Sequence, residues 1–134
     1  MITHGKIIEV KATKMKDEPI KGMSVNVITD SVVNEGSHVK LTYTYVVQYN
    51  EGVARMEIKG ELFAEANSEF GRKLIEGWKK NKMLAPDVAE EVLTGITYAG
   101  SASGTLLAYA ININAPINVP RTKLMQNPAQ PKAG

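Results

Sequence analysis

The feature that most constrains this chain is the alternation of side chains over residues 39–49. The odd positions carry apolar or aromatic side chains, namely Val39, Leu41, Tyr43, Tyr45, Val47 and Tyr49, and the even positions are mostly polar. A period of two in a segment rich in β-branched and aromatic residues is typical of a strand with one buried face. This segment is therefore predicted to be a β-strand.

Three further strands are predicted around it. The turn Asn50–Gly52 leads into a return strand with Ala54, Met56, Ile58, Gly60 and Leu62 on one face and charged residues on the other. Upstream, apolar residues alternate over 23–33, before a turn at 34–37, and over 8–12 at Ile8, Val10 and Ala12. Four consecutive strands with short turns favour an antiparallel sheet with one packed and one wetter face.

The period changes at Asn67, where a short amphipathic helix is predicted. Phe70, Leu74 and Trp78 recur at a spacing of four residues, and Asn67 or Ser68 supplies the N-cap. Three cations lie where the helix dipole favours positive charge, at Lys79, Lys80 and Lys82.

A longer helix is predicted from Pro86, because the fixed φ of proline suits the first helical turn. Its apolar stripe runs through Val88, Val92, Ile96, Ala99, Ser103, Leu107 and Ala110 or Ile111. Gly95, Gly100 and Gly104 interrupt it, each at a cost of about 1 kcal/mol relative to alanine. Either the helix ends near Gly100 and residues 105–113 form a strand, or it continues to about Asn112. The stripe keeps its phase across the glycines, which favours the continuous helix.

Beyond this helix, Pro116 and Pro120 predict an extended segment, and residues 127–134 are predicted to be disordered. Residues 1–126 are expected to form a single domain. The predicted fold class is α+β, a four-stranded antiparallel sheet followed by a short and a long α-helix.

Composition excludes several kinds of chemistry. The chain has no cysteine, which removes disulfides, thiol nucleophiles, iron–sulfur clusters and Cys-based zinc sites. His4 and His38 have no partners at metal-ligand spacing. A net charge of +2 is too small to require a nucleic acid or an anionic membrane as partner. The longest apolar run, residues 106–115, is far shorter than the ~20 residues of a membrane span, so a cytoplasmic location is expected.

Two glycine-containing motifs each lack the residue that their chemistry requires. Gly95 and Gly100 have the spacing of a phosphate-binding loop, but Ser101 stands where the loop needs lysine. Residues 100–104 are similar to a nucleophile elbow, but Ala102 stands where the nucleophile would be. We therefore expect no enzyme activity, no cofactor and no metal.

Two features favour a binding role. The tyrosines at 43, 45 and 49 and the methionines at 15, 23, 56, 83 and 125 adapt to varied apolar partners, although core packing also explains each of them. The long helix has only one short helix of its own chain to pack against, so a second subunit is expected to cover part of it.

The order of these elements resembles the SecB family of export chaperones. The resemblance is clearest over residues 39–124, in the hairpin VARMEIKGELF, the helix opener PDVAEEVL and the tail NAPINVPR. It implies a homotetramer, built as a dimer of dimers, that holds unfolded or precursor polypeptides without ATP. It places client binding near Met23, Phe63, Trp78, Leu106 and Ile117. It also implies a close contact between long helices of two subunits at Ala99, Gly100, Ser103 and Gly104.

The sequence departs from the family in its acidic residues. Family members that dock on the SecA motor use an acidic sheet surface and an acid-rich tail. Here Glu57 is flanked by Arg55 and Lys59, and the tail QNPAQPKAG has no acid. Docking on SecA is therefore not expected, and a general holdase or a client-dedicated, antitoxin-type chaperone fits better.

Two other hypotheses remain open. An oligomeric binding module could hold a small apolar ligand between sheet and helix. An enzyme would need a pair of carboxylates drawn from Glu57, Glu61 and Glu90.

Overall fold

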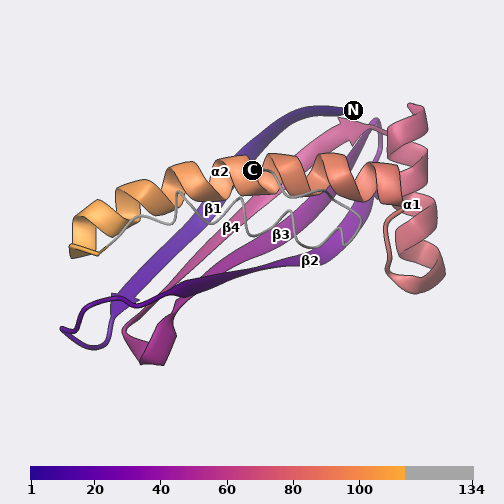
Figure 1. Ribbon diagram of the computed structural model, residues 1–134. Coiled ribbons are helices and arrows are strands. Elements are labelled where there is room, and N and C mark those ends of the chain that lie inside the picture. Colours follow the sequence, from indigo (N-terminus) through magenta and orange to yellow (C-terminus); the bar gives the residue numbers. More distant parts are fainter. Residues whose placement is uncertain (114–134) are drawn as a thin grey trace, which may run out of the picture.

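The computed structural model describes residues 1–113, which form a sheet covered by two helices (Figure 1). The elements are β1 (Ile2–Lys14), β2 (Met23–Glu35), β3 (His38–Tyr49), β4 (Ala54–Glu65), α1 (Glu69–Asn81) and α2 (Pro86–Ile111). A short 3-10 turn at Asn50–Gly52 joins β3 to β4. The predicted α+β fold, with a four-stranded sheet before a short and a long helix, is confirmed.

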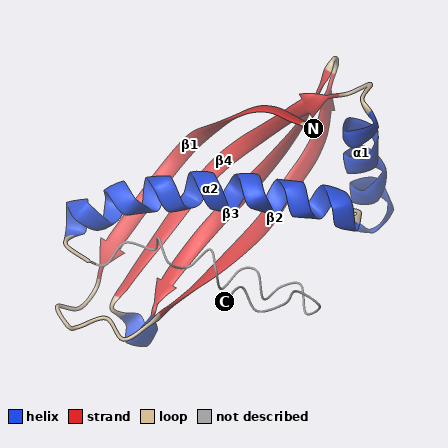
Figure 2. Cartoon of the chain, turned by 45° about the horizontal axis from the view of Figure 1, so that its top comes forward, coloured by secondary structure: helices blue, strands red, loops and turns tan. Residues whose placement is uncertain are grey.

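The sheet is antiparallel throughout, in the order β1-β4-β3-β2 (Figure 2). β1 therefore pairs with β4 rather than with β2, and β1 and β2 form the two edges. The β2–β3 hairpin closes between Glu35 and His38, where Gly36 adopts a φ of 74° that favours glycine.

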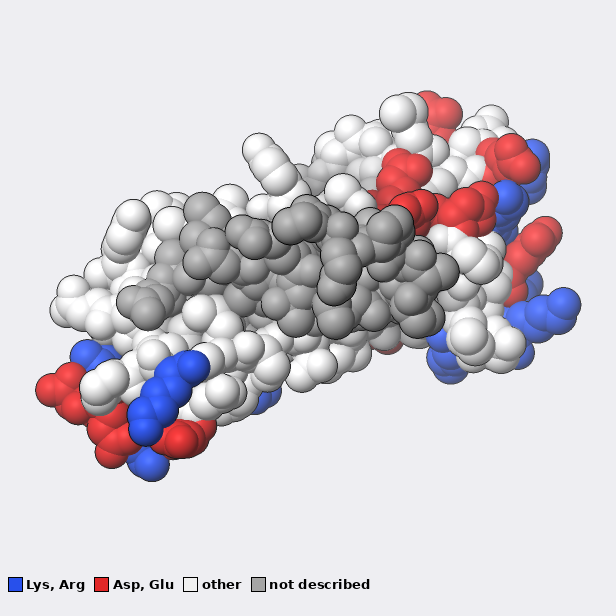
Figure 3. Space-filling model, viewed as in Figure 1, with Lys and Arg blue, Asp and Glu red and all other residues white. Residues whose placement is uncertain are grey.

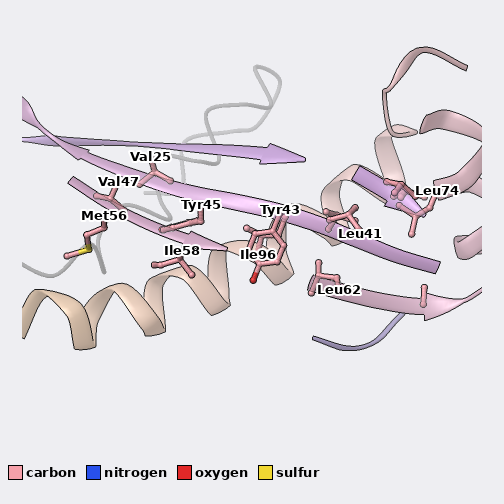
Figure 4. Close-up of a cluster of buried hydrophobic side chains, with 14 of the residues drawn as sticks. Val25, Leu41, Tyr43, Tyr45, Val47, Met56, Ile58, Leu62, Leu74 and Ile96 are labelled. Carbon is pink, nitrogen blue, oxygen red and sulfur yellow. The ribbon is translucent and has the colours of Figure 1, made fainter. Parts of the chain in front are cut away.

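The predicted alternation sets the two faces of the sheet. The odd residues of β3 and the even residues of β4 point to the inner face, which α1 and α2 cover (Figure 4). Charged residues of β4 occupy the outer face. This face is not uniformly wet, because Thr44 and Val46 are also buried there, and the Thr44 hydroxyl donates to Asp30 at 2.6 Å.

A bulge in β1 alters the predicted pattern of this strand. The register with β4 shifts between Ile7 and Glu9, which leaves Ile8 as the extra residue. Ile8 is 50% exposed and Val10, in this edge strand, is 45% exposed, so the run through Ile8, Val10 and Ala12 does not form one buried face. The shifted register places opposite charges across the outer face, in the pairs Lys6–Glu61, Glu9–Lys59 and Lys11–Glu57.

The short helix α1 begins as predicted. Ser68, rather than Asn67, is the N-cap, and its hydroxyl accepts a hydrogen bond from the Gly71 N–H at 3.0 Å. Leu74 is buried in the core, while Phe70 and Trp78 pack at its margin. Lys73 of α1 then reaches Asp87 at the start of α2 at 2.9 Å.

The long helix α2 is continuous through its glycines. Residues 105–111 are helical, so the alternative of a strand over 105–113 is wrong. The predicted stripe is correct only in its first half. The buried line of α2 is Val88, Val92, Ile96, Gly100, Gly104 and Ala108, whereas Ala99, Ser103, Leu107 and Ile111 are half-buried and Ala110 is exposed. A spacing of four residues rotates by about 40° per step, which allows the buried line to follow a twisted sheet beneath a long helix.

The two helices share the inner face of the sheet. α2 packs on β1, β4 and β3, and α1 packs on β2, β3 and β4 (Figures 1 and 2). This leaves β2 outside the main footprint of α2. No helix within residues 1–113 is long and apolar enough to cross a membrane.

Candidate functional site

The structure describes four of the five residues predicted to bind clients, and it does not bring these four together. Met23 begins β2 and is half-buried at the margin of the core, and Trp78 of α1 is half-buried at another part of that margin. Leu106 is exposed on α2, Phe63 points to the outer face, and Ile117 lies outside the described residues.

Phe63 belongs to a small cluster on the outer face. Its ring stacks on His4, with centroids 4.5 Å apart and planes 8° from parallel, and Lys6 Nζ lies 5.8 Å from the ring centroid. Its neighbours Leu62 and Ala64 point to the inner face instead. Because side chains alternate between the two faces along β4, Phe63 points away from the helices. The same alternation was visible in the sequence.

The large exposed side chains of α2 form the most unusual surface of the chain. Tyr98, Leu106 and Tyr109 are 81%, 71% and 73% exposed. Together with exposed Ala102 they are defined here as the exposed face of α2. Sequence reasoning found Leu106 and missed the two tyrosines. The missed signal is the absence of any charged residue over residues 92–111, because a surface helix ordinarily carries charge on its solvent side.

Charged residues lie mainly away from this region. Figure 3 shows Lys, Arg, Asp and Glu side chains gathered at the two ends of the face in view. An uncharged helical stretch with large apolar side chains in solvent, like residues 92–111, is typical of an interaction surface.

The glycines of α2 have a role within the chain. A Cβ at Gly100 would lie 2.6 Å from the Tyr45 ring, so only glycine lets the helix approach the sheet this closely. Gly100 and Gly104 both belong to the buried line of α2. The burial of Gly100 against Tyr45 needs no second subunit. Ala99 and Ser103 are half-buried beside them, and a contact between subunits there stays a prediction.

The tyrosines of β3 are core residues, which confirms core packing for them. Tyr43, Tyr45 and Tyr49 are at most 1% exposed. Burial raises the pKa of each phenol, to about 12 for Tyr49, and the neighbouring Ser101 hydroxyl offsets part of the rise in the pKa of Tyr45. Of the methionines, Met56 is buried, Met15 and Met83 are exposed, and Met125 lies outside the described residues.

Several acids of the sheet surface lie beside cations. Glu57 accepts from Arg55 at 3.0 Å. Glu61 lies between Lys6, at 3.9 Å, and Lys40, at 3.7 Å. Glu35, 3.0 Å from Lys40, raises the pKa of the Lys40 ammonium, and Glu61 adds to that effect. Glu35, Glu57 and Glu61 are therefore each within 4 Å of a cation.

The residues required by the enzyme hypothesis are not brought together. Glu57 and Glu61 lie on the outer face and are paired with cations, whereas Glu90 lies on α2 across the sheet. Among residues 1–113, no group of three or more His, Asp or Glu side chains could hold a metal ion.

A pocket of about 380 Å³ lies at the C-terminal end of α1. Lys73, Glu76, Gly77, Lys80, Asn81, Met83, Leu84 and Ala85 line it. It is not the space between sheet and long helix that the small-ligand hypothesis needs, and its rim is charged.

Comparisons with known proteins support the fold but no family assignment. No family model and no curated protein sequence matches the chain. Among solved structures, the sheet order and paired helices match a SecB-like fold. A matching structure is the Mycobacterium tuberculosis SecB-like chaperone Rv1957, in complex with a ChAD peptide from the Rv1956 HigA1 antitoxin. The TM-score is 0.59 at 10% identity, and the match covers 86% of this chain and 82% of the other.

Proposed function

We propose that this protein is an ATP-independent chaperone that binds unfolded or precursor polypeptides. The observation that carries the proposal is the uncharged stretch 92–111 of α2, which leaves large apolar side chains in solvent within a SecB-like fold. Its mechanism is the burial of apolar client segments at about 25 cal/mol per Å². Many weak contacts spread over several subunits then hold a client without chemistry.

The exposed face of α2 is the proposed contact between subunits. Tyr98, Leu106 and Tyr109 supply aromatic and aliphatic area, and Ala102 between them allows a second helix to approach closely. A helical stretch without charge on any side, such as residues 92–111, is expected to be buried on all sides. We therefore propose a homotetramer, a dimer of dimers with the α2 helices at its centre, in the cytoplasm.

Client binding is proposed on the inner-face surface that the helices leave partly open. Met23 at the start of β2 and Trp78 of α1 are half-buried there and accessible to an apolar segment. Phe63 is better assigned to the His4 cluster on the outer face.

A client-dedicated role is a narrower form of the same proposal. The SecB-like chaperone of similar fold was solved with a peptide derived from an antitoxin. A single dedicated client would use the same apolar surface, whereas delivery to SecA is not proposed because Glu57 is paired with Arg55.

Light scattering from a chemically unfolded client tests the proposal. At one assembly per client, without nucleotide, the full chain is expected to suppress aggregation. Trp78→Asp should weaken suppression, and Lys59→Asp on the outer face serves as the matched control. No suppression by the full chain at stoichiometric amounts would contradict the proposal.

A further inference from the structure

The C-terminal end of α1 carries more positive charge than the chain as a whole. Lys79, Lys80 and Lys82 lie at this end. The chain has 16 Lys and Arg and 14 Asp and Glu, so without these three lysines the acids would be in excess by one. A helix dipole places only about half a negative charge at the end of a helix, which balances a small part of three cations. This end of α1 is therefore a local source of positive potential.

The three lysines have no acidic partner in the described part of the chain. Within it, the ion pairs of α1 are all made by Lys73, with Glu69 at 3.8 Å and with Asp87 at 2.9 Å. No carboxylate oxygen of residues 1–113 lies within 4 Å of the other three ammonium groups. Lys82 Nζ lies 5.4 Å from the centroid of the Trp78 ring instead. Their charge is thus available to an acidic ligand.

Apolar side chains lie beside Lys80. The pocket of about 380 Å³ at this end of α1 is formed between the helix and residues 83–85. A Cβ on Gly77 would overlap the Met83 carbonyl, so glycine allows this segment to pack directly on the helix. Met83 is 62% exposed and Leu84 is half-buried, and both line the pocket. The pocket therefore offers apolar area to a ligand as well as charge.

The two ends of the pocket differ in charge. Lys73 and Lys80 both line it, seven residues apart, which is about 10.5 Å along the helix axis. Lys73 is already shared by Glu69 and Asp87, and Glu76 also lines the pocket. A carboxylate of a ligand is therefore attracted at the Lys80 end and repelled at the Lys73 end.

We propose that this pocket binds a short peptide segment with acidic residues at one end and apolar residues beside them. The acidic residues contact Lys80, and the apolar side chains pack on Met83 and Leu84. An inorganic anion would leave this apolar area unfilled. A volume of about 380 Å³ is near the lower limit of ligand pockets, which suits a few side chains. The site is separate from the exposed face of α2 and does not rest on the proposed function.

The emission of Trp78 reports binding at this site, because Trp78 is the only tryptophan of the chain and directly follows Gly77. The full chain is titrated with the peptide acetyl-GLLGEE-amide, and isothermal titration calorimetry measures the affinity independently. Saturable binding with a change in emission is expected. The peptide acetyl-GLLGKK-amide is the matched control, and it is expected to bind at least tenfold more weakly because its charge is reversed.

Three variants test where the peptide binds. Lys80→Glu is expected to weaken binding about tenfold, because repulsion replaces attraction at an exposed position. Met83→Ser is expected to weaken binding about threefold through the loss of apolar contact. Lys21→Glu makes the same charge change in the exposed loop before β2 and should bind like the parent chain. Circular dichroism checks the fold of each variant.

Several outcomes would overturn this binding site. They are the absence of saturable binding, equal affinity for the two peptides, and unchanged affinity in Lys80→Glu. An equal loss in Lys80→Glu and Lys21→Glu would also overturn it, because it would show attraction to the overall charge of the chain. The test uses no unfolded client, so its failure and the failure of the proposed function are distinguishable.

Discussion

Because Gly100 has no side chain, α2 packs directly against the sheet at this residue. The sequence analysis placed this glycine in a contact between subunits, whereas the structure places it over the Tyr45 ring. The continuous helix was predictable, because its apolar residues recur across the glycines. The partner of Gly100 was not, because a residue without a side chain leaves no pattern that identifies what approaches it.

A comparison of two glycine substitutions tests this contact. Gly100→Ala is expected to destabilise the fold by about 1–3 kcal/mol, because its Cβ would overlap the Tyr45 ring. Gly95→Ala is the control. Its Cβ would meet Ile2 Cδ1 at 3.4 Å, an ordinary contact, so the better helix propensity of alanine should stabilise by up to about 1 kcal/mol. Urea unfolding measures both, and equal effects of the two variants would contradict the assignment.

The buried phenol of Tyr49 is expected to make the fold less stable at alkaline pH. Burial raises its pKa from 10.0 to about 12. Below pH 10 the phenol is neutral in both states and contributes no pH dependence. As pH rises from 10 towards 12, the unfolded phenol ionises first, so stability falls, by roughly 2–3 kcal/mol in total.

Tyr49→Phe separates this effect from other causes of alkaline unfolding. Urea unfolding across this pH range should show a smaller loss of stability in the variant than in the parent chain. An identical loss in both would show that Tyr49 is not the group responsible.

At the scale of elements, alternation and spacing predicted each α-helix and strand that residues 1–113 form. They failed in long elements, where small changes in geometry add up along the element. In β1 one extra residue at Ile8 moved the apolar side chains off a single face. In α2 the buried line drifted from the predicted Ala99 and Ser103 to Gly100 and Gly104, because the helix follows a twisted sheet. Neither effect can be recognised from the local pattern of residues.

The exposed face of α2 gives a prediction at this scale. Leu106→Glu is expected to leave the subunit folded, because Leu106 is 71% exposed, but to dissociate the assembly by placing a charge in the proposed contact between subunits. Ile28→Glu makes the same chemical change at a 48% exposed position of β2. Circular dichroism checks the fold and light scattering checks the mass. An unchanged mass for Leu106→Glu would place the subunit contact elsewhere.

At the scale of the whole molecule, charged residues lie on the outer face of the sheet and at the two ends of the face drawn in Figure 3, while residues 92–111 of α2 carry none. Assembly through α2 would bury this uncharged stretch and keep the charged residues in water. The sequence predicted the need for a second subunit from the length of the helix. It could not predict the face, which depends on how α2 is rotated on the sheet.

The central claim is that several copies of this chain together hold an unfolded polypeptide. Multi-angle light scattering during size-exclusion chromatography, with and without an unfolded client, tests it most directly. The account predicts a particle of four 14.6 kDa chains that co-elutes with the client in the absence of nucleotide. A 14.6 kDa monomer that elutes apart from the client would contradict it.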